Sequence, residues 1–256
     1  MTQPTSSQPS RIVIIGASLA GGSAAIALRD HGYQGELTVI GEESQLPYER
    51  PPLSKAVLIG NTDEPDWVGD EATYADKNIS LRLGTMATRI DRTRKVVVAS
   101  RTEYPYDKLL IATGSAPRRL DIPGADLEGL LTLRTLEESL ALRERFTDGA
   151  TIVIVGAGWI GCEAASAARQ RGANVTVIEP RSQPLLPVVG EQIGATFAAL
   201  HRDHGVDLRL GTGVTGFAGD GVVSSVHIKG HASVPADTVL IGVGAAPNIA
   251  IARPME

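Results

Sequence analysis

The sequence predicts an α/β protein built from two Rossmann-like (doubly wound, three-layer) units with small antiparallel β layers. The first observation is an internal repeat: residues 12–32 and 152–172 align without a gap at an offset of 140, with 11 of 21 positions identical. The second is that each copy runs from an apolar stretch through a glycine-rich turn into an alanine-rich segment, the order of a βαβ unit. The third is the composition, 43% hydrophobic and 21% charged with 28 glycines, which is typical of a globular protein.

Each repeat predicts a buried parallel strand, a helix and a second strand. The apolar runs have the length and composition of strands that are covered on both faces. The alanine-rich helices are expected to end at Gly32 and Gly172, because glycine readily closes a helix. The four expected strands are residues 12–15, 37–40, 152–155 and 175–178.

Further strands complete each unit. Residues 107–114 and 237–244 both run from an apolar strand into a glycine-containing loop, and we expect them to be the last parallel strands, beside a ligand at the carboxyl edge of the sheet. Short alternating segments predict hairpins of the antiparallel layers. These segments are residues 80–83, 88–91, 96–99, 214–217 and 222–228, with a hairpin turn at 219–221. Helices are predicted after a capping box at 135–138 and over 191–205.

The turn of the second repeat carries a full G-x-G-x-x-G between a strand and a helix. Gly156 allows the tight turn, Gly158 lets a pyrophosphate lie against the backbone, and Gly161 lets helix and strand pack closely. Glu179 ends the next strand 18 residues after Gly161, where a carboxylate accepts hydrogen bonds from ribose hydroxyls. This pattern predicts a dinucleotide site and favours NADH over NADPH, although Arg181 softens the preference.

The turn of the first repeat is a weaker fingerprint. It has Gly16 and Gly21 at the outer positions, but Ser18 stands where the middle glycine would be, and Glu42 is the acidic residue. An ordinary βα turn is the alternative. The duplicated context favours a second dinucleotide site.

Charge and cysteine content exclude several classes of function. The net charge of −5 argues against a nucleic-acid partner, because Lys and Arg supply that affinity. The single cysteine, Cys162, allows no intramolecular disulfide and no redox pair; we expect it to be a buried small hydrophobe rather than a reactive thiol, and we expect no metal site. No apolar run approaches the length of a membrane span, residues 1–10 are expected to be a disordered leader, and a cytoplasmic location is expected.

Three motifs carry a resemblance to a known family. They are residues 47–55 (Pro-Tyr-Glu-Arg-Pro-Pro-Leu-Ser-Lys), residues 112–114 (Ala-Thr-Gly) and residues 133–135 (Leu-Arg-Thr). With them, the chain resembles the FAD-dependent pyridine nucleotide-disulfide oxidoreductase superfamily from residue 11 to about residue 250. The branch it resembles contains the ferredoxin reductases that act on putidaredoxin, on rubredoxin and on aromatic-ring dioxygenase ferredoxins.

The resemblance, together with the two turns, implies the cofactors and their contacts. FAD is expected at Gly16, Ser18, Leu19, Ala20, Gly21, Glu42, Arg50, Lys55, Ala87, Thr113, Gly114 and Arg134. NADH is expected at Gly156, Gly158, Trp159, Ile160, Gly161, Glu163, Glu179, Arg181, Gly242, Val243 and Gly244. Lys55 and Glu163 are expected to meet near the flavin and nicotinamide as the catalytic pair. The alternatives are a surface lysine and a solvated first-turn glutamate.

The resemblance also implies an activity and a domain order. The expected activity passes a hydride from NADH to FAD and then single electrons to a ferredoxin or rubredoxin type iron-sulfur protein that feeds an oxygenase. The expected order is the leader, an FAD-binding part at 11–118, an NAD-binding domain at 119–246 and, at 247–256, the start of a return to the FAD domain whose remainder is absent. The alternative is a truncated, non-catalytic NAD(H)-binding remnant that does not retain FAD.

Overall fold

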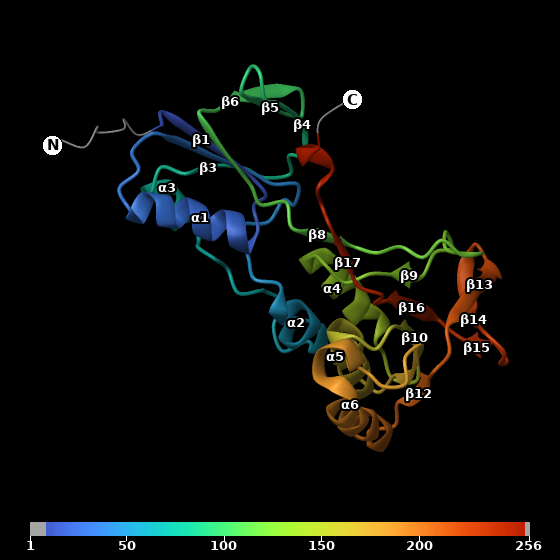
Figure 1. Ribbon diagram of the computed structural model, residues 1–256. Coiled ribbons are helices and arrows are strands. Elements are labelled where there is room, and N and C mark those ends of the chain that lie inside the picture. The colour runs from blue at the N-terminus through green and yellow to red at the C-terminus, as the bar shows by residue number, and fades with distance from the viewer. Residues whose placement is uncertain (1–8, 254–256) are drawn as a thin grey trace. The chain divides into compact units, whose positions relative to one another are not determined.

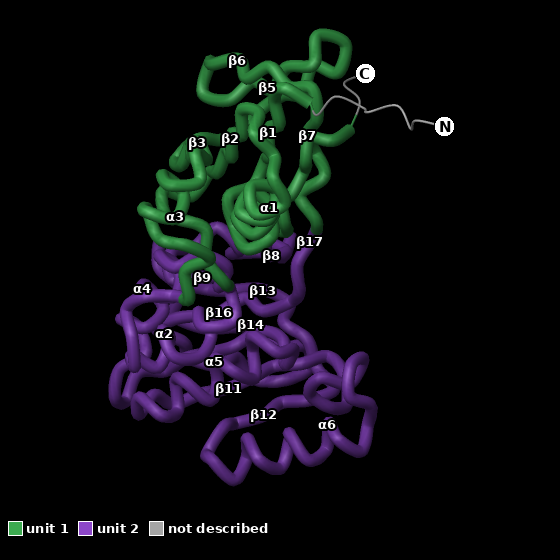
Figure 2. Tube along the Cα trace, turned by 90° about the vertical axis from the view of Figure 1, so that its left-hand side faces the viewer, with its two compact units in different colours: residues 1–49, 66–115, 247–256 green, residues 50–65, 116–246 purple. Residues whose placement is uncertain are grey.

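The computed structural model describes residues 9–253, so most of the expected leader at 1–10 lies outside the described residues. The chain divides into two compact units (Figure 2). The first contains residues 1–49, 66–115 and 247–256, and the second contains residues 50–65 and 116–246. Each unit is an α/β structure with a parallel sheet, which confirms the predicted fold class. Which unit holds which dinucleotide stays a prediction.

The first unit is built on a parallel sheet with the strand order β3-β2-β1-β7, of which Figure 1 labels β1 and β3 and Figure 2 labels all four strands. Its strands are β1 (Arg11–Ile15), β2 (Glu36–Ile40), β3 (Ser80–Arg82) and β7 (Lys108–Ile111). All three pairings are parallel. Helix α1 (Leu19–Asp30) connects β1 to β2, and α3 (Glu71–Asp76) precedes β3. The strand β1 is therefore central, and the turn that follows it lies between the ends of β2 and β7.

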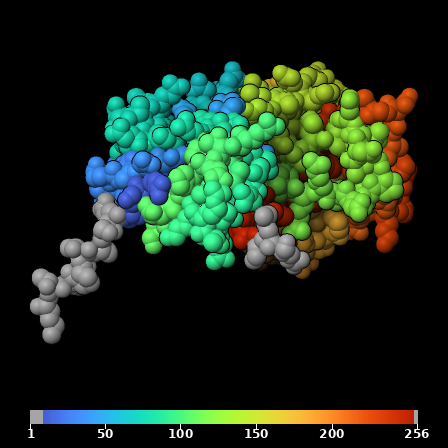
Figure 3. Space-filling view, turned by 90° about the horizontal axis from the view of Figure 1, so that it is seen from above, coloured from blue at the N-terminus to red at the C-terminus, as the bar shows by residue number. Residues whose placement is uncertain are grey.

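Both faces of β1 are covered, which explains its unbroken apolar sequence. Ile12 and Ile14 pack on one face with Ala25 of α1. Val13 and Ile15 pack on the other face in the same cluster as three strands of an antiparallel layer. These strands are β4 (Ala87–Asp91), β5 (Val96–Ala99) and β6 (Thr102–Pro105). The layer, cyan to green, faces the viewer in Figure 3. Helices, parallel sheet and antiparallel layer form the three predicted layers.

One predicted strand belongs to a different sheet. Residues 80–83 were expected in the antiparallel layer, but β3 pairs in parallel with β2, with Thr38 opposite Ser80. The expectation was wrong because α3 precedes this strand and returns the chain to the direction of β2. A short alternating run has the same sequence pattern in a parallel edge strand as in a hairpin.

The second unit repeats the plan around a parallel sheet with the order β12-β11-β10-β16-β9. Its strands are β9 (Leu130–Leu131), β10 (Thr151–Val155), β11 (Asn174–Glu179), β12 (Asp207–Leu210) and β16 (Thr238–Ile241). Helix α5 (Trp159–Gln170) follows β10. Helix α6 (Leu186–Asp203) precedes β12 and contains one non-helical residue, Gly190. Residue 191, where the predicted helix at 191–205 begins, directly follows this break, and the helix ends two residues sooner than predicted.

The core of the second unit is also two-sided. Val153 and Val155 pack with Phe217 and Val226 of an antiparallel layer. This layer consists of β13 (Val214–Asp220), β14 (Val222–Ile228) and β15 (Val234–Pro235). Between β13 and β14 the backbone turns at Gly221 with a φ of 71°, so the predicted hairpin turn is confirmed. On the other side, fully buried alanines of α5 let the helix approach the sheet closely.

Residues 50–65 are attached to the rest of the second unit by side-chain hydrogen bonds. They contain the short helix η1 (Pro51–Ser54) and α2 (Ala56–Ile59). The Ser139 hydroxyl donates to the Leu53 carbonyl at 2.6 Å, and the Arg143 guanidinium donates to the Thr62 carbonyl at 3.1 Å. Both donors lie on α4 (Leu136–Arg145). Arginine with its five donors is well suited to hold several carbonyls of a loop.

The predicted capping box at the start of α4 is confirmed. The Thr135 hydroxyl accepts the Glu138 N–H at 3.2 Å, and the Glu138 carboxylate accepts the Thr135 N–H at 3.1 Å. The same carboxylate also accepts the Arg134 N–H at 2.5 Å and the Thr132 hydroxyl at 2.7 Å. Glu138 thus fixes the loop before the helix as well as the helix end.

Two short strands carry the chain from one unit to the other and back. They are β8 (Ser115–Pro117) and β17 (Ala245–Pro247), and they pair as a two-stranded sheet. After β17 the chain returns to the first unit, where Thr113 and Asn248 exchange hydrogen bonds and Ile251 of η2 (Ala250–Ala252) packs in the core. Among the described residues, no helix is both long and apolar enough to cross a bilayer.

Candidate functional site

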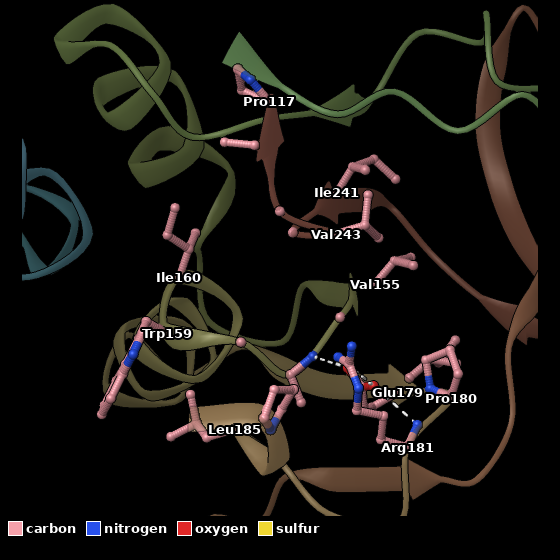
Figure 4. Close-up of a pocket in the computed structure, with 18 of the residues that line it drawn as sticks. Pro117, Val155, Trp159, Ile160, Glu179, Pro180, Arg181, Leu185, Ile241 and Val243 are labelled. Carbon is pink, nitrogen blue, oxygen red and sulfur yellow. Dashed lines mark hydrogen bonds and ion pairs between the residues drawn. The ribbon is translucent and has the colours of Figure 1, made fainter. Parts of the chain in front are cut away.

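A cavity of about 770 Å³ opens in the second unit at the carboxyl ends of β10, β11 and β16 (Figure 4). Its volume is in the range of small-molecule sites, and its position is where doubly wound sheets bind ligands. The predicted NADH residues that line it are Gly156, Gly158, Trp159, Ile160, Glu179, Arg181, Gly242, Val243 and Gly244. Its lining does not include Gly161 or Glu163. The fold therefore brings most of the predicted NADH contacts to one cavity.

The three glycines of the turn differ in what requires them. A Cβ on Gly156 would lie 2.5 Å from the Gly242 oxygen, and one on Gly161 would lie 2.0 Å from the Gly156 oxygen. These two glycines are needed by the packing of the protein itself. A Cβ on Gly158 would meet no atom within 4 Å, and its φ of −78° is open to any residue. The open space at Gly158 fits a ligand that approaches the backbone, as a pyrophosphate does.

The start of α5 is suited to an anion. Gly158 is the N-cap residue and therefore offers no side chain to the first amides of the helix, and the first turn contains no acidic residue. These amides have no partner within the helix, and the helix dipole favours negative charge at this end. Trp159 and Ile160 are exposed beside it, and the Trp159 ring meets Phe197 edge to face at 6.2 Å. The donor set matches a phosphate flanked by apolar surface.

Glu179 is held rigidly at the end of β11 although it is a carboxylate with only 5% of its surface exposed. Its Oε2 accepts the Ala157 N–H at 2.8 Å, and its Oε1 accepts the Arg181 N–H at 3.0 Å. The Arg181 guanidinium lies 3.8 Å from Oε1. Since each carboxylate oxygen accepts more than one hydrogen bond, Glu179 keeps capacity for ribose hydroxyls within the cavity (Figure 4).

Part of the cavity wall was missed by the sequence analysis. The N–H of Leu185 donates to the Ala157 carbonyl at 2.9 Å, and Leu185 has a φ of 55°, a left-handed conformation that a branched residue rarely adopts. Pro187 and Val188 of α6 complete this wall. The stretch Pro-Leu-Leu-Pro at 184–187 was a signal for an ordered loop before α6, since proline is favoured in the first helical turn.

Lys55 and Glu163 are brought together. Lys55 Nζ lies 3.0 Å from Glu163 Oε2, and it also donates to the Pro51 carbonyl at 3.3 Å. The lysine side chain is 54% exposed and that of the glutamate 25% exposed. Glu163 lies in the second turn of α5, so it is a paired and largely covered carboxylate rather than a solvated first-turn residue. The catalytic roles of the two residues stay predictions.

The first unit has an equivalent turn at the carboxyl edge of its sheet. Gly16 has a φ of 114°, and a Cβ on it would lie 2.1 Å from the Ala112 oxygen. A Cβ on Gly21 would lie 1.8 Å from the Gly16 oxygen, which repeats the packing of the second turn. Ser18 is the N-cap of α1, and its hydroxyl makes no capping hydrogen bond. Like α5, α1 has no acidic residue in its first turn, so this end also fits a phosphate.

The other expected FAD residues of the first unit lie on elements around this turn. Leu19 and Ala20 are exposed in the first turn of α1. Glu42 follows β2 and Thr113 follows β7, the two strands that flank β1. Gly114 comes next, with a φ of 64°. Ala87 begins β4. Two residues before it, the Thr85 N–H donates to the Gly41 carbonyl at 2.7 Å.

The remaining expected FAD residues, Arg50, Lys55 and Arg134, belong to the second unit. The Arg50 guanidinium donates to the Arg134 carbonyl at 2.6 Å. Arg134 lines the cavity of the second unit, and its backbone N–H is held by Glu138. The structure therefore joins Arg50 and Arg134 directly.

Cys162 is buried, as predicted. Only 5% of its surface is exposed, and its Sγ donates to the Ala157 carbonyl at 3.6 Å. Burial raises the pKa of the Cys162 thiol to about 12, and the carboxylates of Glu163 and Glu179 add to the shift. The thiol is therefore neutral at physiological pH and packs as a small hydrophobe.

The two glycine-rich turns at sheet edges define a protein of the class that carries two dinucleotide-binding folds in one chain. The chain belongs to the pyridine nucleotide-disulphide oxidoreductase family, whose family model matches residues 10–256. This finding agrees with the family resemblance that the motifs indicated.

The relatives and solved structures that match this chain include reductases of ferredoxin, rubredoxin and putidaredoxin. The ferredoxin–NAD(+) reductase subunit of a benzene 1,2-dioxygenase system from Pseudomonas putida is 40% identical over 243 residues, which are 94% of this chain and 59% of that protein. A rubredoxin–NAD(+) reductase from Pseudomonas putida is 39% identical over 244 residues, or 94% of this chain and 63% of that protein. The crystal structure of a covalent putidaredoxin reductase–putidaredoxin complex matches with a TM-score of 0.91 and 35% identity, over 95% of this chain and 60% of that one. The chain thus spans about three fifths of the length of these relatives.

Proposed function

We propose that the chain is a flavoprotein oxidoreductase that passes a hydride from NADH to FAD and then single electrons to a ferredoxin or rubredoxin type iron-sulfur protein that feeds an oxygenase. The observation that carries the proposal is the pair of glycine-rich turns at the carboxyl edges of two parallel sheets. Relatives named ferredoxin–NAD(+) and rubredoxin–NAD(+) reductases support the choice of partner. A cytoplasmic location is part of the same proposal.

NADH is assigned to the second unit because its cavity has the required chemistry. Gly158 leaves open space at the uncapped start of α5, and Glu179 presents a fixed carboxylate to the ribose. A carboxylate repels the 2′-phosphate of NADPH, so NADH is the proposed donor. Arg181, exposed beside Glu179, is the residue that would allow some use of NADPH.

FAD is assigned to the first unit through the equivalent turn, with the start of α1 for its phosphates and Glu42 for its ribose. When both groups are bound, they supply the hydride transfer and the release of single electrons. Neither step requires a general acid or base. The role proposed for the chain itself is therefore to bind and orient the two rings. Lys55 and Glu163 are proposed to place their ion pair beside the reacting rings.

The absorbance spectrum of the purified 256-residue chain, before and after addition of NADH, tests the proposal. We expect flavin bands that bleach on addition of NADH and recover when a ferredoxin or rubredoxin is added as acceptor. A chain that carries flavin which NADH does not bleach would contradict the assignment of the two sites. In that case, the two glycine-rich turns would not be sufficient evidence that the chain is a reductase.

The second candidate function is an NAD(H)-binding protein that does not retain FAD. It is favoured by one observation: every residue that lines the 770 Å³ cavity belongs to the second unit, so NADH binding does not depend on the first. A colourless protein that binds NADH, even after incubation with FAD, would establish this function in place of the reductase.

A further inference from the structure

A buried hydroxyl converges with Lys55 on one oxygen of Glu163. Ser54, the last residue of η1, donates its hydroxyl hydrogen to Glu163 Oε2, the same atom that pairs with Lys55 Nζ at 3.0 Å. Ser54 is 8% exposed. The other oxygen, Oε1, accepts no hydrogen bond from any residue in the range 9–253. The two donors therefore leave Glu163 with one occupied and one available oxygen.

The two donors differ in how firmly they are held. The Lys55 side chain is more than half exposed, and a long lysine side chain in water retains several conformers. Ser54 is short and buried, and it follows Leu53, whose carbonyl is held by the hydroxyl of Ser139 on α4 at 2.6 Å. Since the terminal torsion of a glutamate is broad, the hydroxyl of Ser54 is the contact that fixes the carboxylate.

We propose that Ser54 is a positioning residue, which fixes the Glu163 carboxylate so that Oε2 is shared with Lys55 and Oε1 accepts no hydrogen bond from residues 9–253. This inference rests on the proposed function for its consequence, the orientation of the Lys55–Glu163 pair toward bound dinucleotides. The contact itself exists without any cofactor. Ser54 thus acts on flavin reduction only through Glu163.

The first test measures the ¹³C chemical shift of the Glu163 carboxyl at pH 7 in the full chain without added cofactor, by NMR of ¹³C-carboxyl-labelled glutamate assigned with Glu163→Gln. Because a hydrogen bond to a carboxylate oxygen changes the shielding of its carbon, Ser54→Ala is expected to move this resonance. Ser54→Thr keeps a hydroxyl and is expected to return the resonance most of the way to its wild-type position.

The matched control is Ser139→Ala, which removes a buried hydroxyl bond from the same short helix without touching Glu163. It is expected to leave the Glu163 carboxyl resonance unchanged. An equal shift in Ser54→Ala and Ser139→Ala would overturn the proposal, because it would mean that loosening of η1, and not the hydroxyl, moves the carboxylate. No shift in Ser54→Ala would overturn it as well.

The second test uses stopped-flow reduction of the flavin-loaded chain by NADH. Ser54→Ala is expected to lower the limiting rate about tenfold at most with little change in NADH affinity, and Ser54→Ala/Glu163→Gln is expected to be no slower than Glu163→Gln alone. Additive losses in the double variant would overturn the proposal. If the wild-type chain holds no flavin, the proposed function fails, and if the flavin of Glu163→Gln is reduced at the normal rate, the role of the pair fails. In either case, the NMR measurement still decides whether Ser54 fixes Glu163.

Discussion

Substitution of Gly158 by alanine is expected to separate ligand binding from folding. The residue has φ −78° and ψ −173°, and an added Cβ would meet no atom within 4 Å. The folded state therefore accepts alanine without strain. The gain from the lost glycine entropy of the unfolded chain, about 0.4–1 kcal/mol, is offset by the poorer preference of alanine for the N-cap, so the free energy of unfolding is expected to change by less than about 1 kcal/mol. Urea denaturation followed by circular dichroism measures this change.

The same substitution is expected to weaken NADH binding. The methyl group would occupy the space that lets a pyrophosphate approach the backbone at the start of α5. We expect the dissociation constant to rise about tenfold or more, equivalent to about 1.4 kcal/mol. Titration of NADH fluorescence measures it. Gly158→Ser, which copies Ser18 of the first turn, is expected to weaken binding to a similar extent.

Gly161→Ala is the matched control in the same turn. Its Cβ would lie 2.0 Å from the Gly156 oxygen, so the backbone must shift and the free energy of unfolding is expected to fall by about 1–3 kcal/mol. The reasoning is refuted if Gly158→Ala loses as much stability as Gly161→Ala. It is equally refuted if Gly158→Ala is stable and binds NADH as tightly as the wild type.

Three further predictions concern other parts of the second unit. Glu179→Ala leaves the buried Ala157 N–H without its acceptor, so the free energy of unfolding is expected to fall by about 1–3 kcal/mol in urea denaturation; an unchanged midpoint would contradict this. The pKa of Cys162 is raised to about 12, so the thiol should be inert to a disulfide reagent at pH 8 until the chain is unfolded. The free energy of unfolding should decline between pH 9 and 12, because the thiol then ionises only in the unfolded chain. Rapid labelling of the folded chain at pH 8 would contradict the prediction of an inert thiol. Glu138→Ala removes the capping box and is expected to cost about 1–2 kcal/mol, measured as a lower thermal midpoint, whereas the exposed Glu144→Ala on the same helix should change little.

The duplicated pattern made the parallel sheets predictable. Apolar runs of four or five residues followed by glycine turns have few alternatives, because a strand covered on both faces needs apolar side chains on both. The positions of Gly156 and Gly161 follow from close backbone contact, which only glycine tolerates. These features depend on local sequence, and the structure agrees with them.

Edge strands and long-range side-chain contacts were less predictable. The segment at 80–83 has a sequence that suits a hairpin, and only the preceding α3 determines that β3 pairs with β2. The hydroxyl of Ser54 and the carboxylate of Glu163 are 109 positions apart in the chain, and no periodicity relates them. The same applies to the wall that Leu185 contributes to the cavity, since this residue is left-handed and its N–H donates to the Ala157 carbonyl of the glycine-rich turn.

By itself, the sequence determined two βαβ units, two glycine-rich turns and the acidic residues at or just after the ends of their second strands, because these depend on backbone geometry within about 30 residues. Only the tertiary structure decided that residues 50–65 join the second unit, that Glu138 holds the loop containing Arg134, and that Ser54 and Lys55 share one oxygen of Glu163. The physical reason is that such contacts are made by side chains from separate elements, and their meeting depends on how those elements pack rather than on any local preference.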